Sequence, residues 1–261
     1  MLVRLLSLLL VLNGCRTVKN DDGKLKVVGG ELALETDSIT KHTVGLVWEN
    51  QNNNTNGCSG VLVGQRWVLT AAHCFTAAGK VEGLQVSFGT KRDTEPNHLI
   101  RASFFSRFER MILPSVDSSK QVYPEDDLAL VKLESDAPID YFAAKIAGPE
   151  VELNAGDLLV MAGFGSTKPD EKDAGLLRKA VLPLSAIDKE SSQLRFSDHA
   201  RSSDFKGSCF GDSGGPVFIP KDGELIVVGI ASGGDYRCRE RSIYTDIRPY
   251  WGWIIPIITD I

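Results

Sequence analysis

The hexapeptide "GDSGGP", residues 211–216, sets an aspartate and a serine inside a glycine-rich turn, between Cys209 and the apolar run 217–219. Glycine, aspartate, serine and proline are the usual turn formers, so a surface turn is the simplest interpretation. The functional interpretation makes Ser213 a nucleophile, which needs a base, a carboxylate that orients the base, and hydrogen-bond donors for an oxyanion. The hexapeptide therefore directs attention to histidines and aspartates elsewhere in the chain.

The chain has 261 residues, 43% of them hydrophobic and 24% charged, which is an ordinary globular composition. This length suits one large all-β domain or two small ones with a substantial core. The formal net charge of −5 argues against nucleic acid and anionic membrane surfaces as partners. An enzyme and a protein-binding domain remain as the classes to separate.

The first residues, "MLVRLLSLLLVLNGC" (1–15), contain an early Arg4 followed by a short leucine-rich run. The run is too short to span a bilayer and predicts an export signal over residues 1–14. The ending "LNGC" resembles the lipobox of bacterial lipoproteins and predicts lipidation of Cys15, against an ordinary cleaved signal in which Cys15 is incidental. We expect an exported protein that is secreted, or that is held in the periplasm or at the outer membrane by a lipid on Cys15, its only membrane contact.

Short apolar or alternating runs recur between turn signals along the rest of the chain, and their Val, Ile and Phe content favours an all-β sandwich or barrel. These runs are 43–49, 59–72, 84–89, 127–133, 157–165, 177–184, 216–219, 224–232 and 242–247. The stretch "PKDGE" (220–224) predicts a hairpin turn. The final "YWGWIIPIITDI" predicts a short helix that packs its apolar side on the domain, with Pro256 inside it.

One of the four histidines, His73, stands at the end of "WVLTAAHC", an apolar run that leads directly into a cysteine. A lone histidine there is more often structural, but the presence of "GDSGGP" reverses that balance. Together these residues resemble the chymotrypsin/trypsin family of serine proteases. In that comparison "LTAAHC" carries the base, "DLALVKL" the orienting aspartate and "CFGDSGGP" the nucleophile, and the resemblance covers residues 27 to about 255.

The resemblance implies two six-stranded antiparallel β-barrels, an active site in the cleft between them, and a protease domain over residues 27–261. It implies that Ser213 attacks the scissile carbonyl, that His73 accepts the proton, and that Asp127 orients His73. Asp127 is preferred to Asp126 because it directly precedes an apolar run. The backbone N–H groups of Gly211 and Ser213 would form the oxyanion hole.

The chain holds five cysteines, at positions 15, 58, 74, 209 and 238. If Cys15 is lipidated, the other four allow three disulfide connectivities by sequence alone. The family resemblance implies one of these, Cys58 with Cys74 and Cys209 with Cys238.

The stretch "KVVGG" (26–30) resembles the activation site of the family, so residues 15–26 are interpreted as an activation segment. Cleavage after Lys26 would free the α-amino group of Val27, which in the family pairs with the aspartate before the nucleophile, here Asp212. A buried carboxylate without a partner is costly. We therefore expect a zymogen whose oxyanion loop is disordered until another protease cleaves the chain.

The resemblance also implies a primary pocket beside the nucleophile, lined by Gly207, Ser208, Ser232, Gly234 and Ser242. Gly207 stands six residues before Ser213, where trypsin-like members carry an aspartate. Without that carboxylate, preference for Arg or Lys is not expected. We expect an aromatic or sizeable aliphatic residue before the cut, although Asp235 or Glu240 could still reach the pocket.

The stretch "GTKRDTEPNH" (89–98) has few acids, so no metal is expected, nor is a cofactor. The expected partners are a protein or peptide substrate and the activating protease, and the enzyme is expected to be a monomer. The alternative is a catalytically silent member of the family that serves in binding or adhesion. An esterase on another fold is excluded because no histidine follows Ser213.

Overall fold

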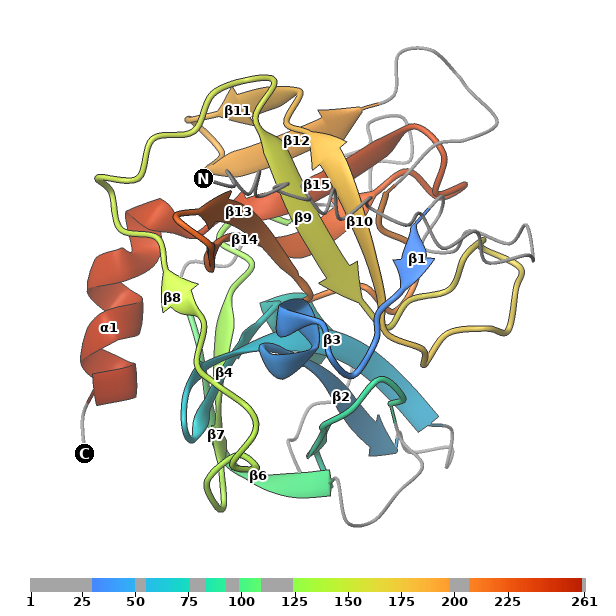
Figure 1. The fold of residues 1–261 in the computed structure, drawn as a ribbon, viewed down its shortest axis with the longest axis vertical. Coiled ribbons are helices and arrows are strands. Elements are labelled where there is room, and N and C mark those ends of the chain that lie inside the picture. The colour runs from blue at the N-terminus through green and yellow to red at the C-terminus, as the bar shows by residue number, and fades with distance from the viewer. Residues whose placement is uncertain are drawn as a thin grey trace, which may run out of the picture.

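The computed structural model describes residues 30–49, 55–75, 83–92, 99–108, 124–197 and 207–259. Within these ranges the chain is mostly β-strand and ends in one short α-helix, α1 (Figure 1). This confirms the predicted all-β class with a short C-terminal helix. The strands are β1 Glu31–Leu32, β2 Thr43–Glu49, β3 Thr55–Gly64, β4 Trp67–Thr70, β5 Gln85–Ser87, β6 Leu99–Arg107, β7 Ala129–Leu133, β8 Lys145–Ile146, β9 Leu158–Gly163, β10 Arg178–Pro183, β11 Ala186–Asp188, β12 Gln193–Ser197, β13 Pro216–Lys221, β14 Glu224–Gly234 and β15 Arg241–Asp246.

Six strands of the N-terminal half close into a barrel in the order β2-β3-β4-β7-β6-β5. Every side chain of β4, "WVLT", is buried, because the strand lies between β3 and β7 in the barrel wall. β4 and β7 pair antiparallel with Thr70 opposite Ala129. This register brings the residues after β4 and before β7 to the same end of the barrel.

The C-terminal half forms a second, nine-stranded sheet. Its longer strands follow the order β10-β9-β13-β14-β15-β12, and these six correspond to the expected second barrel. The short strands β1, β11 and β8 extend the sheet, the last as a parallel neighbour of β14. Among the described residues, the hydrogen-bonded path of this sheet is open rather than closed. The chymotrypsin-like architecture is therefore confirmed, with a larger second unit than the sequence predicted.

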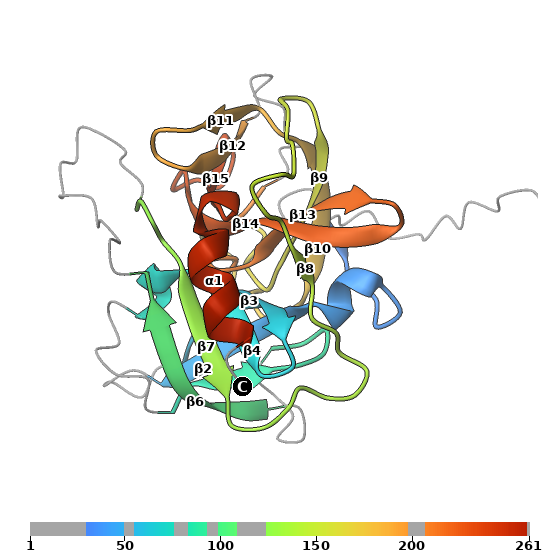
Figure 2. The same cartoon turned by 90° about the vertical axis from the view of Figure 1, so that its left-hand side faces the viewer.

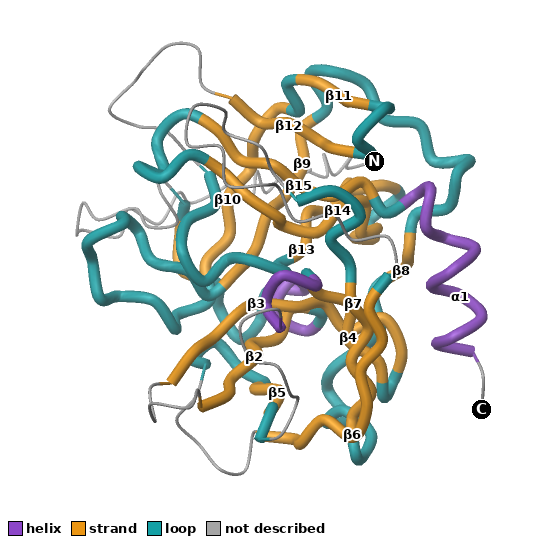
Figure 3. The backbone as a smooth tube through the Cα atoms, turned by 180° about the vertical axis from the view of Figure 1, so that it is seen from behind, coloured by secondary structure: helices purple, strands orange, loops and turns teal. Residues whose placement is uncertain are grey.

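The two units pack directly on one another, one above the other in Figure 3. The contacts between them join β13 to β3 and β9 to β2. One apolar core fills the first barrel and extends to Phe164 and Phe218 of the second unit. A separate core lies within the second sheet. Figure 2 shows the helix α1, Trp251–Thr259, lying on the outside of the strands. It buries Ile254 against the first core and keeps Pro256 exposed. Its apolar side therefore packs on the domain, as expected.

Several N-terminal predictions fall outside the described residues. The export signal over 1–14, the lipidation of Cys15 and the activation site at Lys26 and Val27 all lie in this part of the chain. In the residues that the structure does describe, no helix has the length and apolar character needed to cross a membrane.

Candidate active site

His73 and Asp127 meet at the end of the first barrel. His73 lies in the 3-10 turn Ala72–Phe75, which Ala71 separates from the end of β4. A disulfide from Cys58 to Cys74 fixes this turn to β3. The backbone N–H of His73 donates to Asp127 Oδ1 at 2.8 Å, and His73 Nδ1 lies 2.6 Å from Asp127 Oδ2. The Asp127 side chain has no exposed surface. Its carboxylate therefore holds both the backbone and the ring of His73.

Ser213 completes the arrangement from the second unit. Its Oγ lies 2.9 Å from His73 Nε2, on the opposite side of the ring from Asp127. With Nδ1 facing a carboxylate, the neutral ring carries its proton on Nδ1, so Nε2 accepts the hydrogen bond from the Ser213 hydroxyl. An arrangement of this kind can remove the proton of the serine as it attacks an acyl group. The neighbouring Asp126 instead accepts a hydrogen bond from the hydroxyl of Tyr250.

Ser232 has a contact that the sequence did not predict. It was assigned only to the pocket wall, but its hydroxyl donates to Asp127 Oδ2 at 2.6 Å. The serine is 6% exposed, so water has little access to this bond. A hydrogen bond to an ionised, buried carboxylate is about twice as strong as a neutral one. Ser232 therefore stabilises the ionised carboxylate that faces His73.

The N–H groups of Gly211 and Ser213 are oriented by the carbonyls of the same peptide units. The Phe210 carbonyl accepts from the Ser166 N–H at 2.8 Å, and the Asp212 carbonyl accepts from the Gly215 N–H at 2.8 Å. In a trans peptide the C=O and the N–H point in opposite directions. The Gly211 and Ser213 N–H groups therefore point away from these partners, and within the described residues neither donates a hydrogen bond.

Glycine is required at two points of this loop. Gly211 has φ of 97° and Gly214 has φ of 80°, a backbone region that residues with a Cβ rarely adopt. A Cβ on Gly214 would also overlap Thr70 Oγ1 and the Ser59 carbonyl. The glycines of "GDSGGP" therefore serve the conformation of the loop and its close contact with the first barrel.

Asp212, between these glycines, is a buried carboxylate. Its Oδ1 accepts from the Gly165 N–H and its Oδ2 from the Cys209 N–H, both at 2.8 Å. Burial raises the pKa of Asp212 to about 6, an effect that these two N–H groups and the charges of Arg178 and Arg92 oppose. The sequence reasoning considered only Val27 as a partner of Asp212 and missed these groups.

A cavity of about 540 Å³ lies beside Ser213 and His73. Three residues of the predicted pocket line it, Ser208, Ser232 and Gly234. The other two, Gly207 and Ser242, are buried, and the Ser242 hydroxyl accepts from the Ser208 N–H at 2.8 Å. Phe210 and Tyr236 flank the cavity as a half-exposed and an exposed aromatic ring, packed edge to face with centroids 5.6 Å apart.

The carboxylate of Asp235 also lines this cavity, but it is held by its own loop. It accepts hydrogen bonds from the backbone N–H groups of Arg237, Arg239, Glu240 and Arg241. Partial burial raises the pKa of Asp235, and these N–H groups outweigh that effect and hold it below its usual value. Its lone pairs are therefore directed to the backbone.

In the described part of the chain, no group of three or more His, Cys, Asp or Glu residues is arranged to hold a metal ion. The predicted disulfides are confirmed, with Cα–Cα distances of 6.4 Å for Cys58–Cys74 and 5.2 Å for Cys209–Cys238. Disulfides are typical of proteins outside the reducing cytoplasm.

Comparison with known proteins identifies the family of the chain. The sequence profile of the Trypsin family matches residues 27–254, so the chain belongs to the trypsin family of serine proteases. Coagulation factor XI of Bos taurus is 28% identical to it over 250 residues, a match that covers 89% of this chain. The chain spans only 38% of the length of that relative. The resemblance predicted from the three motifs is thus confirmed at the level of the family.

Proposed function

We propose that this protein is a serine endopeptidase that hydrolyses peptide bonds through an acyl-enzyme. The observation that carries the proposal is the continuous hydrogen-bonded line from Asp127 through His73 to Ser213, with 2.6 Å and 2.9 Å contacts on the two ring nitrogens. His73 and Ser213 come from the two units of the fold and line one cavity, where a peptide would have access to Ser213.

In the first half of the reaction, Ser213 Oγ forms a bond to the carbonyl carbon of the substrate while His73 Nε2 takes the hydroxyl proton. The carbonyl oxygen becomes an oxyanion, which accepts hydrogen bonds from the Gly211 and Ser213 N–H groups. His73 then gives its proton to the leaving amine as the C–N bond breaks.

In the second half, His73 Nε2 accepts a proton from water as the water oxygen attacks the acyl carbon. The same proton returns to Ser213 Oγ when the ester bond breaks, which releases the carboxylic acid product. Asp127 keeps the ring in the productive orientation and stabilises the imidazolium in both halves. Ser232 supports that carboxylate by its 2.6 Å hydrogen bond.

The preferred substrate has an aromatic or sizeable aliphatic residue before the cut. Gly207 and Ser242 supply no charge to the pocket, and the Asp235 carboxylate is taken up by backbone N–H groups. An Arg or Lys side chain would thus be desolvated in the pocket without a carboxylate partner, which is unfavourable.

The protein is exported as a zymogen, and its activity rises when another protease cleaves after Lys26. The new α-amino group of Val27 then adds a positive charge beside Asp212. Export agrees with the two disulfides. A lipid on Cys15 is the only proposed membrane contact, and the enzyme acts as a monomer on protein or peptide substrates.

Labelling with a fluorophosphonate probe tests this function, before and after limited cleavage between Lys26 and Val27. We expect faster labelling after cleavage and none in Ser213→Ala. His73→Ala serves as a second control, because it removes the base and keeps the hydroxyl. A folded wild-type chain that is not labelled in either state would identify a silent binding protein instead. Fluorogenic peptides that differ only in Phe, Leu or Arg before the cut test the preference.

A further inference from the structure

In the uncleaved chain, positive charge beside Asp212 comes from two arginines. Val27 follows Lys26 through a peptide bond in the 261-residue chain, so its nitrogen is not an α-amino cation there. Arg178 and Arg92 both act on Asp212 electrostatically, and both oppose the effect of its burial. The two arginines come from different units of the fold, so their convergence on one carboxylate calls for a structural explanation.

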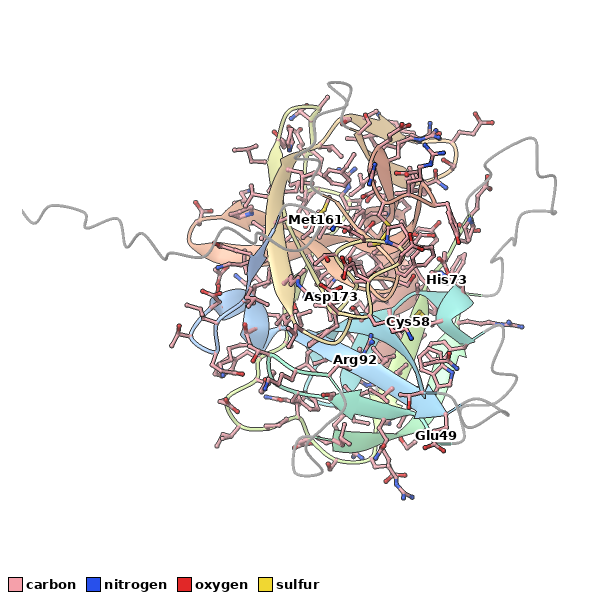
Figure 4. The ribbon with its side chains drawn as sticks, turned by 90° about the vertical axis from the view of Figure 1, so that its right-hand side faces the viewer. Glu49, Cys58, His73, Arg92, Met161 and Asp173 are labelled. Atoms are coloured by element: carbon pink, nitrogen blue, oxygen red, sulfur yellow. A yellow bond between two sulfur atoms is a disulfide. The ribbon has the colours of Figure 1, made fainter. Side chains whose placement is uncertain are left out.

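Arg92 approaches from the first barrel along a groove left by two strand glycines. A Cβ on Gly45 would lie 2.6 Å from Arg92 Cγ, and a Cβ on Gly57 would overlap the guanidinium. Nη1 donates to the Cys58 carbonyl at 3.4 Å, and it lies 3.6 Å from where a Cβ of Gly211 would stand. Figure 4 shows Arg92 next to Cys58, at the level where the two units meet. Glycines inside strands often mark such a close approach.

Arg178 approaches Asp212 from β10, and its side chain is 1% exposed. Its Nη1 donates to the Gly165 carbonyl at 2.8 Å, and its Nη2 pairs with Asp173 at 3.3 Å. Gly165 therefore binds Arg178 through its C=O and Asp212 through its N–H. The next residue, Ser166, holds the Phe210 carbonyl and so the orientation of the Gly211 N–H. Arg178 thus supports the same loop as Asp212.

We infer that Arg92 and Arg178 are positioning residues for the proposed peptidase, which hold Asp212 as a carboxylate and thereby keep the oxyanion loop in its anion-binding form. This inference rests on the proposed function. Neither arginine touches the substrate or the reacting atoms. They act through the two hydrogen bonds that the Asp212 carboxylate accepts, from the Gly165 N–H and from the Cys209 N–H.

The other titratable groups near Asp212 are accounted for in the described residues. Tyr244, on β15, is buried, and its burial and the charge of Asp212 both raise its pKa, so it stays neutral. Asp173, before β10, offsets part of the charge of Arg178. Arg92, after β5, is the cation that can be changed with the least damage to the core, since it is only half-buried.

Protonation of Asp212 would remove one of its anchors. A protonated carboxyl carries an O–H, which is a donor and opposes a backbone N–H. Loss of a nearby positive charge raises the pKa of a carboxyl, so the loop would loosen at a higher pH. Because oxyanion donors act in the transition state, the loss falls on kcat and on acylation rather than on KM.

The decisive comparison is Arg92→Gln against Arg92→Lys, which keeps the charge. Arg66→Gln is the control, because Arg66 is also partly exposed and donates to the backbone carbonyls of Leu133 and Glu134. The first measurement is a carboxyl-carbon NMR titration of the intact chain, with Asp212→Asn to assign the signal. We expect the midpoint of Asp212 to rise by about one pH unit in Arg92→Gln only.

The second measurement is the rate of fluorophosphonate labelling of the intact, uncleaved chain, in which Val27 supplies no charge to Asp212. A shift of that size lowers the ionised fraction about fivefold near pH 6 and less than about twofold near pH 8. We expect the labelling rate of the intact chain to follow this pattern with pH in Arg92→Gln relative to Arg92→Lys. Gly57→Ala, which displaces the guanidinium, should act in the same direction.

The outcomes separate this inference from the proposed function. Equal midpoints in Arg92→Gln and Arg92→Lys would overturn the inference, whatever the labelling rates. A shifted midpoint with an unchanged labelling profile would overturn the positioning role. A wild-type chain that resists labelling at every pH would overturn the peptidase proposal, and the NMR titration would still decide whether the arginines hold the carboxylate.

Discussion

The hydroxyl of Ser59 donates to the carbonyl of Gly211 at 2.9 Å, although the two residues are 152 positions apart in the chain. The same hydroxyl accepts from the Phe164 N–H at 2.9 Å, and the Ser59 N–H donates to the Ser213 carbonyl at 2.8 Å. Ser59 has no exposed surface. A single buried serine of the first barrel thus holds two carbonyls of the loop that carries the proposed nucleophile.

Ser59→Ala should lower kcat about tenfold with little change in KM, because the Gly211 carbonyl loses its donor and the oxyanion loop gains freedom. Steady-state kinetics on a fluorogenic peptide provide the measurement. Thr40→Val is the matched control, since Thr40 is also fully buried and donates its hydroxyl to a carbonyl, that of Leu34, at 2.7 Å. Equal losses in the two variants would show a general effect on stability instead.

Ser232→Ala should lower kcat about tenfold, because the ionised Asp127 loses a short hydrogen bond from a buried donor. Asp127→Asn should lower it by about 10^4, the magnitude typical of chymotrypsin-type triads. Both changes act through the same carboxylate, so the double variant should be no slower than Asp127→Asn alone. Additive losses would mean that Ser232 acts on the substrate in the pocket.

Asp212 should make the fold less stable as the pH rises from about 4 to 6. Burial raises its pKa from 3.8 to about 6, so the folded state binds the proton more tightly than the unfolded state in that window. The contribution is fully present below pH 3.8 and is lost above about 6, a change of about 3 kcal/mol.

The measurement is the free energy of unfolding in denaturant at both ends of that window, in Ser213→Ala to prevent self-digestion. Asp212→Asn in the same background cannot titrate at this position. Its free energy of unfolding should therefore fall less as the pH rises from about 4 to 6. Identical falls in the two chains would contradict the assignment of the pH dependence to Asp212.

Gly207→Asp should shift the preference toward Arg and Lys, since it adds a carboxylate next to Ser208 in the cavity wall. The variant should then cleave after its own Lys26, so the intact chain should process itself in a concentration-dependent way. Gly207→Asn adds nearly the same volume without charge and should do neither. Gel analysis of the N-terminal fragment and the peptide series provide the readouts. Gain of Arg cleavage in both variants would point to shape rather than charge.

The meeting of His73, Asp127 and Ser213 could be predicted from the sequence because each lies in a motif that resembles one of the chymotrypsin/trypsin family. The pairing of Thr70 with Ala129 then brings the ends of β4 and β7 together. The strand runs themselves were visible as apolar alternation. The size of the second sheet could not be predicted, because the strands β1, β8 and β11 have only two or three residues and no pattern of their own.

The supporting residues could not be predicted in the same way. Ser59 looks like an ordinary strand serine, and its role depends on a loop 152 positions away. Arg92 was considered only as part of a stretch with few acids, where no metal was expected. Its role depends on Gly45 and Gly57 in two paired strands. Those two glycines inside strands were the available sign that another side chain packs against the barrel there, since glycine weakens a strand unless another group needs the space.

His73 and Asp127 belong to the first barrel, and Ser213 belongs to the second unit. A chain in which only one half has folded therefore holds a base without a nucleophile, or a nucleophile without a base. Under the proposed function, digestion would be confined to molecules in which both halves have docked. For the same reason, separately expressed halves should each be inert and regain peptidase activity only on reassembly.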